Sequence, residues 1–142
     1  MNDWRSELGN FLTERNRRSR AEKEAARFKD FIARVVLPAF QEICNELKKY
    51  GRTTEIRETD AAATLSVSMD NENEISFQVI CRSLPDTIIP CAEARYRERK
   101  GQRILKSDVL FREAGAKYVL EDVTKDEIIQ GFLKAYRTTF ED

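Results

Sequence analysis

The chain has 142 residues, of which 25 are Lys or Arg and 25 are Asp or Glu, and it contains no histidine. Charged residues make up 35% of the chain and apolar residues 41%, a balance that excludes strongly disordered proteins. Without histidine, a Ser-His-Asp or Cys-His nucleophile and a His-ligated metal site are also excluded. The length suits one domain, which we place at residues 1–142.

Targeting signals and cysteine usage indicate the compartment. No run of about 18 apolar residues occurs, so we expect no transmembrane helix and no membrane partner. The first residues lack a basic start followed by an apolar stretch, so we expect no secretory leader. Cys44, Cys81 and Cys91 form no CxxC pair and lie among apolar residues. They are typical of free core thiols, and we expect a cytoplasmic protein.

The N-terminal region carries a short amphipathic pattern. Its apolar residues recur at helical spacing: Trp4, Leu8, Phe11 and Leu12. A polar, arginine-rich stretch follows at residues 15–20. We interpret residues 1–20 as a helical arm with a basic connector. An arm of this kind folds back on its own domain, swaps onto a second copy, or binds a separate partner.

A second, longer helical pattern runs from Phe28 to Tyr50 and ends at Gly51. Its apolar side chains cover roughly half of the helix circumference, so we expect it to pack against a sheet on one side and another helix on the other. Pro38 lies inside the pattern and predicts a kink near Leu37.

The middle of the chain reads as antiparallel strands. Apolar and polar residues alternate over 64–69 and 75–82, on either side of a turn at 70–73, which predicts a hairpin with one buried and one solvated face. We expect further strands at 53–58, 89–99, 103–112 and 118–120, with a turn at Lys100-Gly101.

The C-terminal region predicts a helix that begins with a capping box, Thr124 to Glu127. Its apolar stripe consists of Ile128, Ile129, Phe132, Leu133, Tyr136 and Phe140. The sequence therefore predicts an α+β fold, in which an antiparallel sheet of four to six strands is packed on one face by the N-terminal helices and by this C-terminal helix.

Two basic segments interrupt the balanced charge, residues 15–29 and 93–106. In the first, four guanidinium groups are suited to phosphate or nucleic-acid binding: Arg15, Arg17, Arg18 and Arg20. The sequence pI of 6.4 and the lack of interleaved aromatic residues argue against that use. In the second, Arg95, Arg97 and Arg99 share one strand face, which suits an acidic protein, a phosphate-bearing ligand or a partner strand.

Catalytic and cofactor signatures are missing. The chain has no GxxxxGK[ST], GxGxxG or GxSxG motif, and we expect no cofactor and no metal. The closest acidic cluster is Glu121, Asp122, Asp126 and Glu127, which we attribute to the electrostatics of a helix start. We therefore prefer binding to catalysis and rank a carboxylate-based hydrolase third.

The function that the sequence favours is a small cytoplasmic binding or assembly module acting through protein–protein contacts. The residues that we expect to carry it are Trp4, Leu8, Phe11, Leu12, Arg95, Arg97 and Arg99. A homodimer is the form that we favour. The alternative is a nucleic-acid-associated module that uses segments 15–29 and 93–106.

Overall fold

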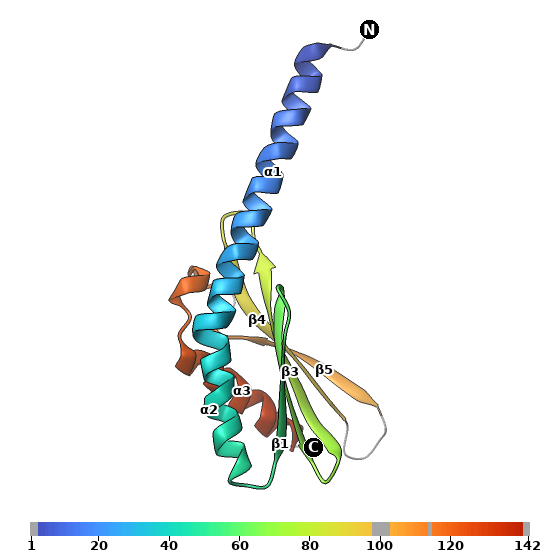
Figure 1. The fold of residues 1–142 in the computed structure, drawn as a ribbon, viewed down its shortest axis with the longest axis vertical. Helices are drawn as coiled ribbons and strands as arrows, with labels where there is room; N and C mark the ends of the chain where they lie inside the picture. Colours follow the sequence, from blue (N-terminus) through green and yellow to red (C-terminus); the bar gives the residue numbers. More distant parts are fainter. Residues whose placement is uncertain (1–2, 98–102, 114, 141–142) are drawn as a thin grey trace.

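The computed structural model describes residues 3–97, 103–113 and 115–140. They form a five-stranded antiparallel sheet, a long N-terminal helix and a C-terminal helix, so the predicted α+β fold is confirmed (Figure 1). Within these ranges, no helix combines the length and the apolar character that crossing a membrane requires.

The N-terminal region is one helical rod rather than two helices. It consists of α1 (Trp4–Phe31), the π-helical turn η1 (Ile32–Val36) and α2 (Leu37–Lys48). The prediction of a connector at residues 15–20 was wrong, because the helix continues through them. Arg, Ala, Glu and Lys are strong helix formers, and the pairs Glu14–Arg18 and Arg20–Glu24 lie at helical i,i+4 spacing.

The irregularity predicted near Leu37 takes the form of the π turn. The Leu37 N–H donates to the Ile32 carbonyl five residues earlier, and Pro38 lies in the first turn of α2. Proline has no N–H to donate, and its ring crowds the carbonyl four residues before it. A turn with one extra residue accommodates both effects, so the helix continues beyond the proline.

The strands form a simple meander in the order β1-β2-β3-β4-β5. Their bounds are β1 Thr53–Glu58, β2 Ala62–Met69, β3 Glu72–Ser83, β4 Ile88–Arg97 and β5 Ile104–Leu110. The β2–β3 connection is a two-residue turn, in which Asp70 and Asn71 have φ of 53° and 65°. Asp and Asn tolerate this left-handed conformation better than most residues, which fixes the hairpin register. The predicted turn at Lys100-Gly101 lies outside the described residues.

The strand predicted at 118–120 was wrong. This segment leads into a 3-10 turn, η2 (Leu120–Asp122). The Val119 N–H donates to the carboxylate of Asp122 at 3.1 Å, which caps the turn and takes the donor that a strand would give to its neighbour. Leu120 is buried in the core.

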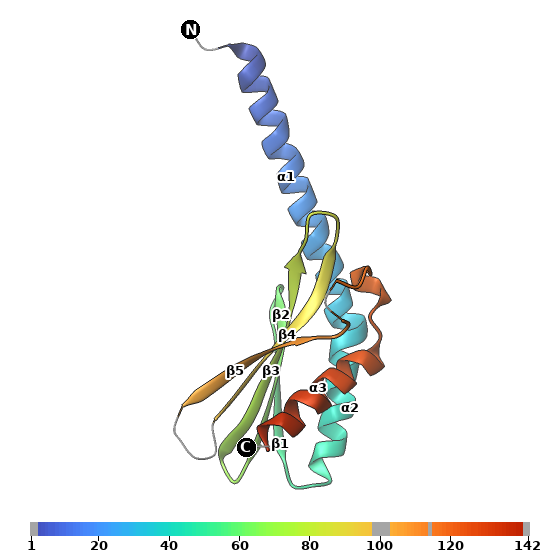
Figure 2. The ribbon, with the colours of Figure 1, turned by 180° about the vertical axis from the view of Figure 1, so that it is seen from behind.

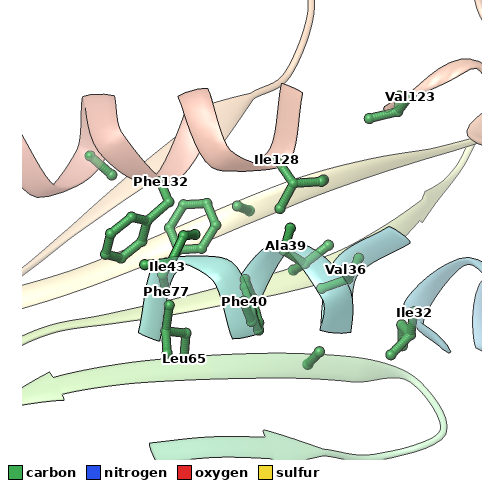
Figure 3. Packing of buried hydrophobic residues seen from close by; sticks show 14 of the residues in the cluster. Ile32, Val36, Ala39, Phe40, Ile43, Leu65, Phe77, Val123, Ile128 and Phe132 are labelled. Carbon is green, nitrogen blue, oxygen red and sulfur yellow. The ribbon is translucent and has the colours of Figure 1, made fainter. Parts of the chain in front are cut away.

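The core lies between the inner face of the sheet and the helices α2 and α3 (Lys125–Thr139) (Figure 3). Thr124 and Glu127 form the predicted capping box at the start of α3. The Phe77 ring from β3 contacts rings from both helices, Phe40 at 6.3 Å and Phe132 at 5.5 Å between centroids. The helix around Phe40 therefore packs against both surfaces, as its wide apolar stripe predicts.

Gly131 has a packing role in α3. A Cβ atom at this position would lie 2.6 Å from the ring of Phe111, which follows β5. The missing side chain therefore lets the end of β5 approach α3 closely, which offsets the lower helix propensity of glycine.

No helix of the described residues covers the other face of the sheet (Figure 2), whose central rows are polar. The register places one row of residues across it: Glu55, Ser66, Ser76, Arg95 and Lys106. We call this surface the outer face.

Candidate functional site

The N-terminal part of α1 projects from the body as an arm (Figure 1). Every residue from Asp3 to Lys23 is exposed. The helix reaches the body at Arg20, whose guanidinium donates to the carbonyls of Leu84 at 3.1 Å and Pro85 at 2.8 Å. At 1.5 Å per residue, the helix from Trp4 to Arg20 is about 24 Å long. We call residues 4–19 the arm.

The arm carries the predicted apolar residues on one face. Their exposed fractions are 63% for Trp4, 48% for Leu8, 61% for Phe11 and 47% for Leu12. At 100° per residue, these side chains fall within a sector of roughly 100° around the helix axis. We call this group the arm stripe. It is a contiguous apolar surface that no other described residue covers.

The arm stripe faces away from the side on which the helix joins its own body. The same rotation places Phe28 and Phe31, the first buried residues of α1, roughly 150° from the middle of the stripe. Because residues 4–31 form one unbroken α-helix, the stripe cannot turn onto its own core without a break in the helix. Of the three arrangements considered for the arm, folding back is therefore inconsistent with this structure.

The four arginines expected to bind phosphate have different roles. Arg20 is held by Glu24 at 3.0 Å and by the two loop carbonyls. Arg17 and Arg18 lie 3.9 Å and 3.8 Å from the carboxylate of Glu14. The helical rotation places Arg15 and Arg18 on the same side as the arm stripe, one turn further along. The positive charge of Arg15 therefore continues the apolar stripe, beside the Arg18–Glu14 pair.

The arginines of β4 lie elsewhere. Arg95 and Arg97 are exposed on the outer face, and Arg99 lies outside the described residues. The C-terminal end of β4 is at the end of the sheet remote from the arm (Figure 1). The structure therefore does not bring the two basic segments together. Glu93 also interleaves with them and accepts from Lys106 at 3.1 Å.

Two residues of the acidic cluster at the start of α3, Glu121 and Glu127, form ion pairs. Two guanidinium nitrogens of Arg27 each lie 2.7 Å from a carboxylate oxygen of Glu121, which ties α1 to η2. Arg112 forms a similar bidentate pair with the Glu127 carboxylate, with nitrogen–oxygen distances of 2.9 Å and 3.1 Å. These hydrogen bonds hold the pKa of both carboxyl groups below the usual value of 4.5. Glu127 also caps the start of α3, as the attribution to a helix start predicts, whereas Glu121 joins η2 to α1.

A groove that the sequence analysis did not identify runs between α2 and α3, with a volume of about 490 Å³. Its walls are mostly apolar, and Leu133, Tyr50 and Phe140 remain exposed on them. The apolar stripes of both helices were visible in the sequence. The gap between them was not, because it depends on the distance between two elements far apart in the chain.

Arg52 and Tyr136, which line this groove, belong to a half-buried polar network. The Tyr136 hydroxyl donates to Glu74 at 2.7 Å, and the Arg52 Nε lies 3.2 Å from both the Glu74 carboxylate and the Tyr136 oxygen. Burial and the bond to Glu74 raise the pKa of Tyr136 to about 12. Arg52 is fully engaged here, since it also donates to the Tyr50 carbonyl at 3.0 Å. The network joins β3, α3 and the start of β1.

A second hollow, of about 550 Å³, lies between β5 and α3. Asp108, Glu113 and Lys134 are among the residues that line it. In the described ranges, no group of three or more Cys, Asp or Glu side chains is placed to hold a metal ion. The three cysteines are free thiols, and burial raises the pKa of Cys81 to about 11.

The comparisons with known proteins identify no relative: the chain matches no family model, no curated protein and no solved structure.

Proposed function

We propose that the protein is a binding or assembly module, and that the arm stripe is the surface by which it docks on a partner protein. The observation that carries this proposal is the direction of the stripe. A rigid helix presents four large apolar side chains to solvent, on the side opposite to its own core. Exposed apolar clusters on monomeric proteins are commonly interaction sites, because leaving them in water is unfavourable.

The chemistry of the stripe defines the partner. An amphipathic helix binds by laying its apolar face into a groove, with anchors at spacings of three and four residues. Trp4 and Phe11 are the two largest anchors, and aromatic residues of this kind dominate binding energy in protein interfaces. The positively charged Arg15 follows on the same side. We infer a partner with an apolar groove that ends in acidic side chains.

The arm also supports protein binding over the nucleic-acid alternative. Arg17, Arg18 and Arg20 are each paired with a glutamate of their own helix. The aromatic residues of the arm, Trp4 and Phe11, lie with the leucines in the stripe and do not interleave with the arginines of residues 15–20, where stacking on bases would need them.

The three free thiols support the compartment that we assign. Cys44 and Cys91 are buried and Cys81 is half-buried, and the structure pairs none of them in a disulfide. Unpaired thiols are typical of a reducing environment, and we propose a cytoplasmic location on that basis.

The test compares two faces of the same helix. A photo-reactive residue is placed at Phe11 in the full chain, or at Thr13 on the opposite side of the arm as a control, and cell extract is irradiated. We expect a specific adduct from position 11 alone, with the cross-link mapping to an apolar, acid-rimmed groove of the partner. In the chain that carries the photo-reactive residue at position 11, Leu8→Glu is expected to abolish the adduct. Asn10→Glu, which lies outside the arm stripe, is expected to leave the adduct unchanged.

Two results would contradict the proposal. One is equal cross-linking from positions 11 and 13, which means that the arm has no preferred face. The other is an adduct that survives Leu8→Glu, which means that the apolar stripe is not the contact.

A further inference from the structure

The strand β5 forms one edge of the sheet, and β4 is its single neighbour among the described strands. An edge strand presents a row of backbone N–H and C=O groups that a further strand can pair with. Ile104 is 70% exposed and Leu110 is 43% exposed, at the two ends of the strand.

The residues of β5 are complementary to the same residues read in reverse. The outer face carries Ile104, Lys106, Asp108 and Leu110, and the inner face carries Leu105, Ser107 and Val109. Ser107 is the midpoint of the strand. When the strand is rotated by half a turn about Ser107, apolar residues fall opposite apolar residues, and the lysine falls opposite the aspartate.

We propose that the β5 edge binds a second copy of this chain, β5 against β5 and antiparallel, with Ser107 opposite Ser107 of the second copy. The two sheets then form one continuous ten-stranded sheet. This surface is distinct from the arm stripe, and the inference does not depend on the function proposed for the arm.

Symmetry selects this register among its neighbours. Identical antiparallel strands in one sheet are related by a two-fold axis perpendicular to it, so each symmetric register is centred on a residue. A centre at Lys106 places lysine opposite lysine, and a centre at Asp108 places aspartate opposite aspartate. Like charges directly opposite are destabilising, and unlike charges are stabilising. Only the centre at Ser107 forms two Lys106–Asp108 pairs and also aligns the full length of the strand.

The pairing of β5 within its own chain supports a partner on the other side. The register with β4 places Arg95 opposite Lys106 and Glu93 opposite Asp108, so like charges face each other across the strands. Lys106 reaches diagonally to Glu93 at 3.1 Å. A second β5 would place an aspartate directly opposite Lys106 and a lysine directly opposite Asp108. These unlike-charge pairs compensate the like-charge pairs between β4 and β5.

The opposite edge of the sheet shows no such pattern of exposed apolar residues. The exposed side chains of β1 are polar or charged, and Ile56 is partly buried against the core. Arg57 pairs with Glu55 of the same strand at 2.8 Å. Charged edges with no exposed apolar residue are a common protection against sheet-to-sheet association. We therefore assign the self-association to β5 alone.

The test is a charge exchange across the two-fold axis. Sedimentation velocity of the full chain over a dilution series is expected to show a monomer–dimer equilibrium. Lys106→Asp and Asp108→Lys each convert two attractive pairs into two repulsive ones, and we expect each to raise the dimer dissociation constant roughly tenfold or more. Mixing the two variants restores the unlike pairs, so the mixture is expected to form a heterodimer about as tight as the wild-type dimer.

The double variant Lys106→Asp/Asp108→Lys provides a second test. Its residues 106 and 108 again carry opposite charges across the two-fold axis, so it is expected to dimerise like the wild type. Arg57→Asp on β1 is the matched control and is expected to dimerise normally. The proposal is overturned if the wild type is a monomer at every concentration, or if the single variants dimerise as well as the wild type. A dimer that Leu8→Glu abolishes, but that is insensitive to the charge exchange, also overturns it, because the arm is then the contact.

Discussion

The two halves of the N-terminal helical rod have the same secondary structure for different reasons. From Phe28 to Cys44, the helix buries large side chains against the sheet and α3. From Trp4 to Lys23, every residue is exposed. Tertiary packing stabilises the half from Phe28 to Cys44. Apart from the contact of Arg20 with the Leu84 and Pro85 carbonyls, the half from Trp4 to Lys23 depends on local terms, including the Asp3 cap on the Arg5 N–H and the i,i+4 ion pairs.

This contrast shows how a short helix is held in solvent. An isolated helix of the arm's length is marginal in water, because the first turn is unfavourable to form. Here the first helical turn is already formed in the half that packs on the body, from Phe28 to Cys44, and the arm adds residues to that existing helix. Gly9 is tolerated inside the arm although it lowers helix stability by about 1 kcal/mol. The arm is therefore helical because the body is folded.

The largest expected difference between the halves concerns aromatic side chains. Phe40 is fully buried beside Phe77, and Phe40→Ala is expected to lower the free energy of unfolding by about 3–5 kcal/mol through lost burial and a cavity. Phe11→Ala in the arm is expected to change it by less than about 0.5 kcal/mol. Denaturant-induced unfolding, followed by circular dichroism, measures both. Equal destabilisation by the two variants would show that the arm stripe is packed against its own body.

A smaller effect is expected for the polar network of the body. Tyr136→Phe removes the hydroxyl that donates to Glu74 and leaves that half-buried carboxylate short of a partner. We expect a loss of about 1–2 kcal/mol in unfolding free energy. Tyr50→Phe serves as the control, because Tyr50 is 63% exposed, and its variant is expected to unfold like the wild type. A Tyr136→Phe protein of wild-type stability would contradict the role given to the network.

The smallest effect is expected at the junction of the halves, and it depends on pH. The hydrogen bonds from Arg27 hold the pKa of Glu121 below 4.5 in the folded state. A lowered carboxyl pKa contributes stability that is complete above pH 4.5 and is lost as the pH falls through the folded value. Glu121→Gln is therefore expected to cost less than about 1 kcal/mol, since the pair is half exposed.

The measurement is the unfolding free energy in buffers above and below pH 4.5. The difference between wild type and Glu121→Gln is expected at the higher pH and should shrink as the pH falls. Glu14→Gln, which removes an exposed pair within the arm, is expected to leave the unfolding of the body unchanged at both. A difference that grows on acidification would have the wrong sign for this pair.

The fold was largely predictable because its signals are local. Alternation over 64–69 and 75–82 predicts the central hairpin, and Thr124 with Glu127 predicts the start of α3. The segment 118–120 was misassigned because its apolar residues resemble a strand. The capping contact of Asp122 with the Val119 N–H, which selects the turn, has no such pattern.

The surfaces were predictable only in part. The arm stripe follows from helical spacing, but its direction needs the helix to continue through residues 15–20, which were interpreted as a connector. The symmetry of β5 was present in the sequence from Ile104 to Leu110. It has a meaning only once β5 is known to be the edge of the sheet, which is a property of the whole topology.

The π turn between α1 and α2 has a consequence for the direction in which the arm stripe faces. A regular helix over Ile32–Val36 would contain about one residue fewer, and each residue rotates a helix by about 100°. Removing one residue from this turn would therefore rotate the arm about the helix axis relative to the body, so that Trp4 would face a different direction. The length of the arm and the composition of its stripe would stay the same. The direction of the arm stripe and its composition are thus encoded at two separate places in the chain.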